Sequence, residues 1–283
     1  SPGNAAVRHS RDKCGKTGKF FDSEQPGRRG LAARDSGMLA ARGPLRMNEL
    51  ELTGRARTHI VELEHPRCAL HYGVVTSFLA MRDAATAAGI DLVAASGFRD
   101  FDRQLLLWNR KWRGERPLHD RAGQLLDPAQ LDDAGRVEAI LCWSAIPGGS
   151  RHLWGTDVDV IDGAAMPSGY QVQLVPEEYA ADGVFARLAA WLVENMGRFG
   201  FYRPYSTAGC GAGIEPWHLS YAPVSAAALE ELTLPVLRRA VAASDMLGKA
   251  QVLARLPEIY TRFVLAVDPP VAAALQGRGS SRA

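Results

Sequence analysis

The chain has 283 residues, of which 47% are apolar and 23% are charged, and its formal net charge is +2. This composition is typical of a globular protein, and the length fits one large domain or two small ones. The small net charge gives no electrostatic reason to expect a nucleic-acid partner, and no apolar run approaches the roughly 20 residues of a transmembrane segment.

The two ends of the chain differ in composition from the middle. Residues 1–46 are rich in Gly, Ser, Lys and Arg without a sustained apolar period, so we expect a disordered leader or sequence upstream of a start at Met47. We expect a folded domain over 47–270 and a loose C-terminal tail over 271–283. No secretory signal is recognisable, which favours a cytoplasmic protein over one of the periplasm or cell envelope.

The four cysteines are Cys14, Cys68, Cys142 and Cys210. They lie far apart and form no CxxC pair, so we expect neither a disulfide framework nor a cysteine-based zinc site. They are expected to be buried or incidental thiols.

Helix and strand patterns follow one another from residue 71 onward. Residues 71–90 have apolar residues at helical spacing and a glycine near the end, as a C-terminal cap requires. Residues 91–97 are predicted to form a short buried strand, and residues 100–112 a second helix with an aspartate near its start. A polar stretch with glycine and proline covers about 113–135.

The second half of the chain continues this mixture. Residues 158–162 form a short β-branched strand pattern, and 176–200 open with proline and acids and close on glycines, which predicts a helix. Residues 214–221 are predicted to be a strand whose alternate side chains face opposite ways. Two helices, or helix pairs broken by proline, follow over 225–244 and 247–264. Because no regular βαβ rhythm appears, the predicted fold class is α+β.

Residue types that bind metals gather in the stretch SRHLWGTDVDV. His152 and Asp159 are seven residues apart, and Gly155 between them allows a turn that folds a loop histidine back onto a strand aspartate. Asp157 and Asp159 project to the same face of a strand, so either is a candidate carboxylate ligand, with Asp162 a weaker one. The alternative is a capped turn with solvated acids.

A second segment, EPWH, places Glu215 three residues before His218. A catalytic zinc ion has three protein ligands and an open position, and His152, His218 and one aspartate would supply the three. Glu215 is close enough in sequence to act as general base for the zinc-bound water. A surface glutamate near a core histidine would explain EPWH alone, but the two segments together predict a zinc centre.

A third stretch, SGFRDFDRQ, places Arg99 at a strand-to-helix junction and Gln104 one turn into the helix. A guanidinium binds a carboxylate through two parallel hydrogen bonds, which would suit an enzyme that recognises a free C-terminus. The competing interpretation, which the spacing alone favours, is a surface arginine paired with Asp100 or Asp102.

These three stretches together resemble the signatures of VanY-type D-alanyl-D-alanine carboxypeptidases, within the wider group of lysostaphin, D-Ala-D-Ala peptidases and the hedgehog fold. SRHLWGTDVDV is similar to their Ser-x-His-x-x-Gly-x-x-x-Asp signature, EPWH to Glu-x-Trp-His, and SGFRDFDRQ to a Ser-Gly-Tyr-Arg…Gln segment. The resemblance covers about residues 50–265 and implies helices flanking a small, mainly antiparallel sheet that carries a zinc site. Phe98 stands where tyrosine is commoner, and Asp157 where alanine is usual.

The resemblance also implies the metal ligands. His152, Asp159 and His218 would bind one zinc ion, so residues 47–270 would form a zinc carboxypeptidase domain. The choice of Asp159 over Asp157 follows from motif position alone. Asp157 would then add charge near the zinc ion or accept a hydrogen bond from a ligand histidine.

Roles in catalysis and substrate binding follow from the same resemblance. Glu215 would be the catalytic base, and Arg99 would stabilise the oxyanion of the tetrahedral intermediate or hold the substrate's carboxylate. Ser150 and Gln104 would contact the substrate. Trp217 adjoins a proposed ligand and is expected to line the pocket.

The implied function is zinc-dependent hydrolysis of peptidoglycan-type stem peptides. A D,D- or L,D-carboxypeptidase would release a C-terminal D-alanine through attack of a zinc-bound water. Two alternatives stay open, namely a peptidoglycan endopeptidase of the same family and a zinc-stabilised binding module without turnover. The expected partner is a peptide derived from peptidoglycan, and no oligomeric state is implied.

Other conspicuous residues are expected to be structural. His65, His71 and His119 each lack a partnered motif. The basic run KWRGER over 111–116 is expected to stay solvated, the alternative being that it attracts an acidic cell-wall fragment.

Overall fold

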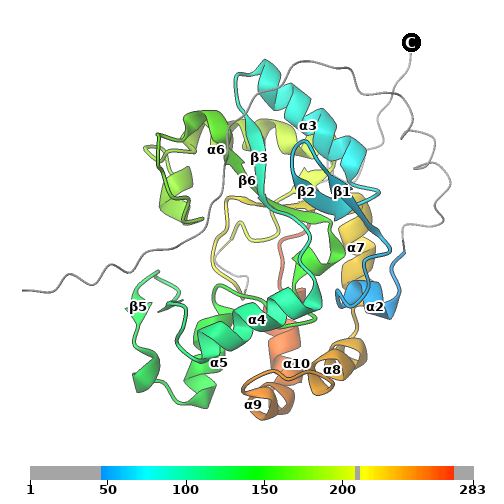
Figure 1. Ribbon diagram of the computed structural model, residues 1–283, viewed down its shortest axis with the longest axis vertical. Coiled ribbons are helices and arrows are strands. Elements are labelled where there is room, and N and C mark those ends of the chain that lie inside the picture. The colour runs from blue at the N-terminus through cyan, green and yellow to red at the C-terminus, as the bar shows by residue number, and fades with distance from the viewer. Residues whose placement is uncertain (1–45, 208–210, 271–283) are drawn as a thin grey trace, which may run out of the picture. The chain divides into compact units, whose positions relative to one another are not determined.

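The structure, a computed structural model, describes residues 46–207 and 211–270 (Figure 1). The described residues belong to one compact unit. The expected leader, apart from Arg46, lies outside them, as do the expected tail and two of the four cysteines. The other two, Cys68 and Cys142, are free thiols. Among the helices of these residues, none combines the length and the apolar character that crossing a bilayer requires.

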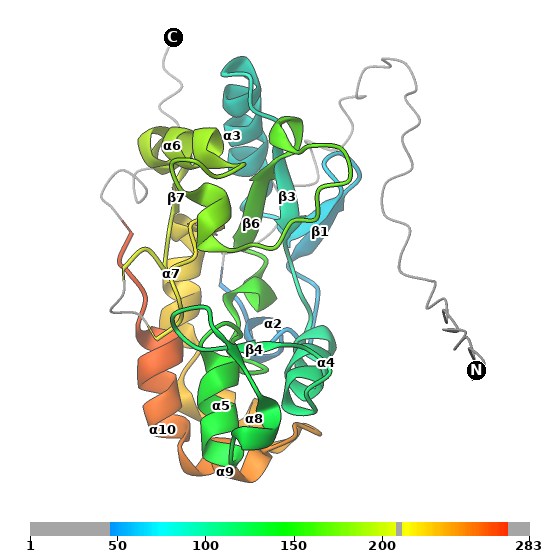
Figure 2. The same ribbon diagram turned by 90° about the vertical axis from the view of Figure 1, so that its left-hand side faces the viewer.

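A four-stranded antiparallel sheet forms the centre of the fold (Figure 2). Its strands lie in the order β3, β6, β8, β7, and they cover Leu92–Ser96, Asp157–Asp162, His218–Tyr221 and Phe201–Tyr202. The alternation in β6 sends Val158 and Val160 into the hydrophobic core, while Asp157 and Asp159 occupy the other face. Helices flank this small antiparallel sheet, so the predicted α+β fold is confirmed.

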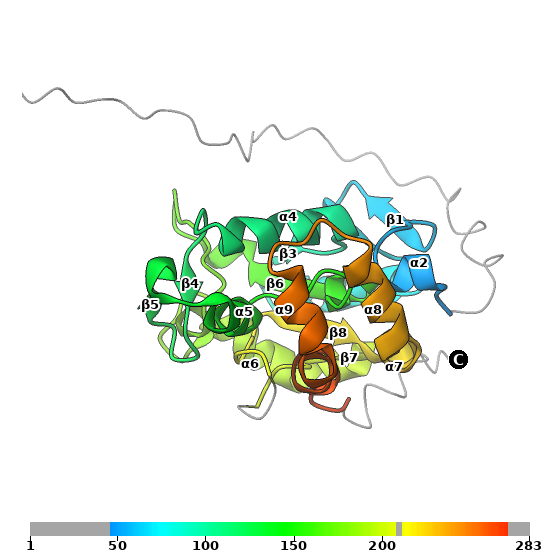
Figure 3. The same cartoon turned by 90° about the horizontal axis from the view of Figure 1, so that it is seen from below.

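The helices gather toward two ends of the described unit. Figure 1 and Figure 2 show α3 (Val75–Ala87) and α6 (Ala186–Asn195) near strands β3, β6 and β7. The remaining helices are α2 (Glu49–Leu52), α4 (Phe101–Trp112), α5 (Asp133–Leu141), α7 (Ala222–Glu231), α8 (Leu234–Ala242), α9 (Lys249–Ala254) and α10 (Leu256–Ile259). Figure 3 views the end at which α4, α5, α8 and α9 lie in front of the sheet. Helix pairs broken by proline are among the expectations for residues 225–244 and 247–264. They are confirmed, because α7 and α8 form the first pair and α9 and α10 the second.

Two predicted elements are shorter than expected. Residues 176–200 do not form one helix. The helix α6 is flanked by 3-10 turns over Pro176–Tyr179 and Met196–Phe199, and a non-helical stretch separates the first of these turns from α6. The break has a local cause. The carboxylate of Glu178 accepts hydrogen bonds from the backbone N–H groups of Gln173 and Leu174, which holds the chain in a turn.

Strand β8 begins at His218 rather than at residue 214. The N–H of His218 donates to the carbonyl oxygen of Glu215 at 3.1 Å, so the residues between them form a turn. Several short elements carry no clear pattern in the sequence, because two to four residues are too few to show a period. They are the hairpin strands β1 (Ile60–Leu63) with β2 (Cys68–His71), and β4 (Leu118–His119) with β5 (Leu125–Leu126). Helix α5, also unpredicted, begins at the edge of the stretch expected to be polar loop.

Candidate metal centre

Two of the predicted metal ligands face each other across neighbouring strands. In the antiparallel pair β6 and β8, Asp159 is paired directly with His218. Directly opposed residues project to the same face of a sheet, so the carboxylate and the imidazole meet there. The alternation of β6 also puts Asp157 on this face, as its spacing from Asp159 predicts.

His152 reaches the same face from a 3-10 helix, η2 (Arg151–Trp154), that precedes β6. Gly155 ends this helix with φ of +66°, a conformation that residues with a side chain rarely adopt. A Cβ at Gly155 would lie 2.7 Å from the backbone nitrogen of His71, so the close approach of β2 also requires glycine. The predicted turn that returns the loop histidine onto the strand is confirmed.

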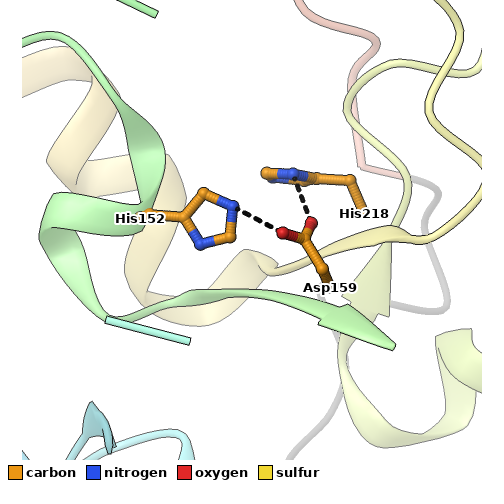
Figure 4. A group of neighbouring side chains, drawn as sticks. All are labelled: His152, Asp159 and His218. Carbon is orange, nitrogen blue, oxygen red and sulfur yellow. Dashed lines mark ion pairs between the residues drawn. The ribbon is translucent and has the colours of Figure 1, made fainter. Parts of the chain in front are cut away.

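Figure 4 shows the three predicted ligands pointing toward one another, and their ligand atoms all lie within 4.8 Å. Nε2 of His152 is 3.3 Å from Oδ2 of Asp159, and Nδ1 of His218 is 3.2 Å from Oδ1 of the same carboxylate. All three side chains are buried. Within residues 46–207 and 211–270, no other group of three potential ligands meets in this way.

Hydrogen bonds on the far side of each imidazole decide which nitrogen faces this cluster. Nδ1 of His152 donates to the carbonyl oxygen of Gly97 at 2.9 Å, and Nε2 of His218 donates to Oδ1 of Asp157 at 3.0 Å. Both partners are acceptors, so the hydrogen must lie on the imidazole nitrogen in each case. The other nitrogen of each neutral ring then presents a lone pair to Asp159, which is the tautomer that binds a metal ion.

The donor atoms of the cluster fit a zinc ion. Oδ1 of Asp159 is buried without a hydrogen-bond partner when His218 is neutral, because the nearest nitrogen, Nδ1 of His218, then also presents a lone pair. Lone pairs that converge in a buried space are unfavourable unless a cation or a proton lies among them. Two imidazole nitrogens and one carboxylate oxygen are a ligand set that zinc accepts.

The charges of the cluster are strongly perturbed. Burial opposes ionisation of Asp159, yet His152 and His218 hold the pKa of this carboxyl well below its usual range. Burial also lowers the pKa of His218, but the nearby carboxylates of Asp157, Asp159 and Glu215 outweigh burial and raise that pKa well above its usual value. A metal ion that enters the cluster therefore competes with a proton on His218.

Asp157 lies behind the cluster and is fully buried. In addition to the bond from His218, its carboxylate accepts one from Nε of Arg151 at 2.8 Å. Its other oxygen accepts from the hydroxyls of Thr156 and Ser220. Although burial works in the opposite direction, Arg151 and His218 hold the pKa of Asp157 well below its usual range. Of the two roles expected for Asp157, the structure shows the hydrogen bond with a proposed ligand histidine.

Arg151 is a site residue that no sequence motif singles out. Its guanidinium is buried, and Nη2 donates to the hydroxyls of Tyr202 at 3.1 Å and Ser220 at 2.6 Å. It also lies over the ring of Trp154, 4.8 Å from the centroid. The sequence does carry a signal for Arg151, because it lies in a short apolar segment next to a predicted ligand. A charged side chain in such a segment is buried only if it is paired, so its position indicates a buried ion pair.

Glu215 lies beside the cluster. Its Oε2 is 3.3 Å from Nδ1 of His218, and its side chain is 15% exposed, so solvent can reach it. The N–H of Glu215 donates to the carbonyl oxygen of Tyr205 at 2.9 Å, and the Tyr205 ring packs edge-on against His218 with centroids 5.1 Å apart. This placement is suitable for a general base next to a bound metal ion.

Arg99 turns toward the cluster and not toward the aspartates near it in sequence. Its backbone N–H donates to the carbonyl oxygen of His152 at 3.1 Å, and its side-chain Nη1 donates to Oε1 of the buried Gln104 at 2.9 Å. Asp100 instead caps α4, and no ion pair joins Arg99 to Asp100 or Asp102 in the described part of the chain. The surface pair that the spacing favoured is therefore wrong, and Gln104 orients Arg99.

Two other residues expected to contact the substrate are buried. Ser150 directly precedes η2 and is 3% exposed, and its substrate contact remains a prediction. The ring of Trp217 lies in the hydrophobic core, with its centroid 5.7 Å from that of Tyr179. This position gives Trp217 a packing role and does not support the expected contact with substrate.

Known proteins are similar to parts of this chain. A stretch of 98 residues, 34% of the chain, is 46% identical to an uncharacterised protein of Haemophilus influenzae and covers 67% of that protein. A stretch of 148 residues, 51% of the chain, is 29% identical to a D-alanyl-D-alanine carboxypeptidase of Enterococcus faecalis and covers 45% of it. Among solved structures, VanYB in complex with D-alanine-D-alanine is 26% identical with a TM-score of 0.42, over 59% of this chain and 79% of that one.

The family model described as VanY, D-alanyl-D-alanine carboxypeptidase, matches residues 67–224. This span is more than half of the chain, and it contains the metal-ligand cluster together with Arg99 and Glu215. The resemblance carried by the three sequence motifs is therefore confirmed at the level of the family. The chain belongs to the VanY family of D-alanyl-D-alanine carboxypeptidases.

Proposed function

We propose that this protein is a zinc-dependent peptidase that acts on peptidoglycan-type stem peptides and releases a C-terminal D-alanine. The observation that carries the proposal is the buried cluster of His152, Asp159 and His218, with the Glu215 carboxylate 3.3 Å from one of its nitrogens. Membership of the VanY family supports the substrate class.

Zinc is the metal that this donor set favours. Calcium and magnesium prefer ligands that are all oxygen, whereas zinc binds imidazole nitrogen and carboxylate oxygen readily. Three protein ligands, His152, Asp159 and His218, leave one position open, which is the arrangement of catalytic zinc sites. When bound, the ion would supply a Lewis acid that polarises a carbonyl and makes water nucleophilic near neutral pH.

Glu215 is placed to move the proton of the reaction. Its Oε2 would accept a proton from the attacking water and later donate it to the nitrogen of the departing D-alanine. The partial exposure of this side chain leaves it accessible to substrate, whereas the three proposed ligands beside it are buried. A positioned general base typically contributes about 10²- to 10⁴-fold to the rate.

Arg99 supplies positive charge to the site. Its guanidinium is oriented by Gln104 and by the hydroxyl of Ser96, 3.4 Å from Nη2. A guanidinium keeps its charge at every physiological pH, so it would stabilise the negative charge that develops on the scissile carbonyl oxygen. The three groups thus divide the work between holding the metal ion, transferring the proton and stabilising the oxyanion.

A defined peptide tests the proposal. The full chain is loaded with zinc and incubated with an N-acetylated Lys-D-Ala-D-Ala peptide, and the products are identified by mass. We expect loss of one C-terminal alanine, abolition by a chelator and recovery on adding zinc. Cleavage of an internal bond only would identify an endopeptidase, zinc binding without cleavage would identify a binding module, and failure to bind zinc would contradict the proposal outright.

A further inference from the structure

Lys111 departs from the expectation that the basic run over 111–116 is solvated. Arg116, at the end of this run, is exposed, but Lys111 is half-buried. Lys111 follows Gln104 and Trp108 at helical spacing, and both of those residues are buried on the inner face of α4. Its ammonium group is therefore directed into the protein and not into solvent.

One short segment holds Lys111 and Arg99 near each other. Nζ of Lys111 donates to the hydroxyl of Ser144 at 2.7 Å. The next residue, Ala145, accepts a hydrogen bond at 2.7 Å from Nε2 of Gln104, and the same Gln104 amide binds the guanidinium of Arg99. Lys111 thus binds one residue of this loop directly, and Arg99 is linked to the next residue through Gln104.

The same loop is joined to the segment that carries Glu215. The N–H of Gly213 donates to the carbonyl oxygen of Cys142 at 3.0 Å, two residues before Ser144. Glu215 follows Gly213 by two residues. The loop that binds Lys111 is therefore also hydrogen-bonded to the segment that carries the proposed base.

Both cations have only neutral hydrogen-bond partners in the described part of the chain. Lys111 binds the Ser144 hydroxyl, and Arg99 binds the Gln104 amide and the Ser96 hydroxyl, with no carboxylate in ion-pair contact with either. Burial and the positive charge of Arg116 lower the pKa of Lys111 to about 8. A partly desolvated ammonium group without an acidic partner is costly unless a ligand brings the negative charge.

The two cations are placed differently relative to the metal ligands. The backbone N–H of Arg99 donates to the carbonyl oxygen of His152, a proposed ligand, whereas Lys111 is linked to Arg99 only through Ser144, Ala145 and Gln104. Arg99 is accordingly the cation beside the scissile bond, and Lys111 lies beyond it. On the basis of the function proposed above, we propose that Lys111 binds the free C-terminal carboxylate of the substrate peptide, which makes the enzyme an exopeptidase.

The test compares a peptide that has this carboxylate with one that lacks it. The substrates are N-acetylated Lys-D-Ala-D-Ala and its C-terminal amide, and the variants are Lys111→Met, Lys111→Arg and Lys249→Met, the last as a matched control on α9. The wild type is expected to prefer the acid by on the order of 10- to 100-fold in kcat/KM, the range of one charged hydrogen bond. Lys111→Met should lose this preference by slower turnover of the acid alone, while Lys111→Arg and Lys249→Met retain most of it.

A binding measurement separates this proposal from the proposed reaction. Calorimetric Kd values for both peptides are measured in the full chain with Glu215→Gln, with and without Lys111→Met. An acid preference in binding that disappears with Lys111→Met supports the assignment even if the wild type cleaves neither peptide. A wild type that binds acid and amide equally, or a Lys111→Met variant that keeps the preference or weakens both peptides alike, overturns it.

Discussion

Nε2 of His218 donates a hydrogen bond to Oδ1 of Asp157 at 3.0 Å, and Asp157 accepts another from the buried guanidinium of Arg151 at 2.8 Å. The bond on Nε2 leaves Nδ1 of His218 with its lone pair toward Asp159. Asp157 therefore orients a proposed metal ligand from the side away from the ion, at a position where the family pattern usually has alanine.

Replacing Asp157 with asparagine should weaken zinc binding by about 10- to 100-fold, the usual effect of losing a hydrogen-bond partner behind a metal ligand. Asparagine retains the shape but not the charge that makes the His218 imidazole a better donor to the metal. Competition with a chromophoric chelator measures the Kd. An Asp157→Asn variant with the affinity of the wild type would show that His218 does not depend on this bond.

The buried Arg151–Asp157 pair predicts a characteristic pattern of stability. Asp157→Ala leaves the Arg151 guanidinium buried and unpaired, and we expect a loss of about 3–5 kcal/mol in the free energy of unfolding. The double variant Asp157→Ala/Arg151→Met removes both charges and should lose clearly less. Urea unfolding of the metal-free proteins provides the comparison, and a double variant less stable than Asp157→Ala would contradict this account.

Glu215→Gln should lower kcat by about 10²- to 10⁴-fold and leave zinc content unchanged, because the amide cannot accept the proton and Glu215 is not among the three proposed ligands. Turnover of the D-Ala-D-Ala peptide and metal analysis of the same preparation test both parts. Near-normal activity in this variant would remove Glu215 from the role of base.

Gly155→Ala should destabilise the fold through two separate effects. The φ of +66° is unfavourable for alanine, and the new Cβ would lie 2.7 Å from the backbone nitrogen of His71. The conformational effect alone costs about 1–2 kcal/mol. Gly123→Ala is the matched control, because Gly123 has φ of +78° but no atom within 4 Å of an added Cβ. Equal losses in the two variants, measured by urea unfolding, would show that the contact with β2 is unimportant.

The lowered pKa of Lys111 predicts a pH dependence. Because this pKa is about 8, the ammonium group is charged below pH 8 and becomes neutral as the pH rises through that value. The kcat/KM for the peptide acid should therefore fall above about pH 8, since this parameter reports the free enzyme. The charged and titratable groups around Lys111 are Arg99, Arg116, Glu215 and Cys142. Lys111→Arg should shift the decline to higher pH, and an unshifted profile would show that Lys111 does not cause the decline.

The chemistry of the candidate site is largely readable from local sequence. His152, Asp159 and His218 are recognisable because their residue types bind metals and because motif position separates Asp159 from Asp157. Gly155 signals the turn before the strand, and the two-residue alternation of β6 correctly places both aspartates on one face. The longer helices α3 and α4 are also predictable from local sequence, because their apolar residues recur at helical spacing over several turns.

Other features depend on contacts between distant segments. The interior placement of Trp217 and Lys111 follows from packing against Tyr179 and Ser144, which the local pattern of neither segment encodes. Such contacts outweigh the local preference for helix or strand, because they bury apolar side chains and provide hydrogen-bond partners for polar groups.

By itself, the sequence determined which residue types are available for a metal centre, a base and an anion-binding group, and which of them share a strand face. Only the tertiary structure decided that β6 and β8 pair with Asp159 opposite His218, that Gly97 and Asp157 select the imidazole tautomers, and that Lys111 faces inward. The physical reason is that spacing along the chain controls side-chain direction over a few residues. Pairing register and hydrogen-bond partners depend on which distant segments bury their apolar faces together.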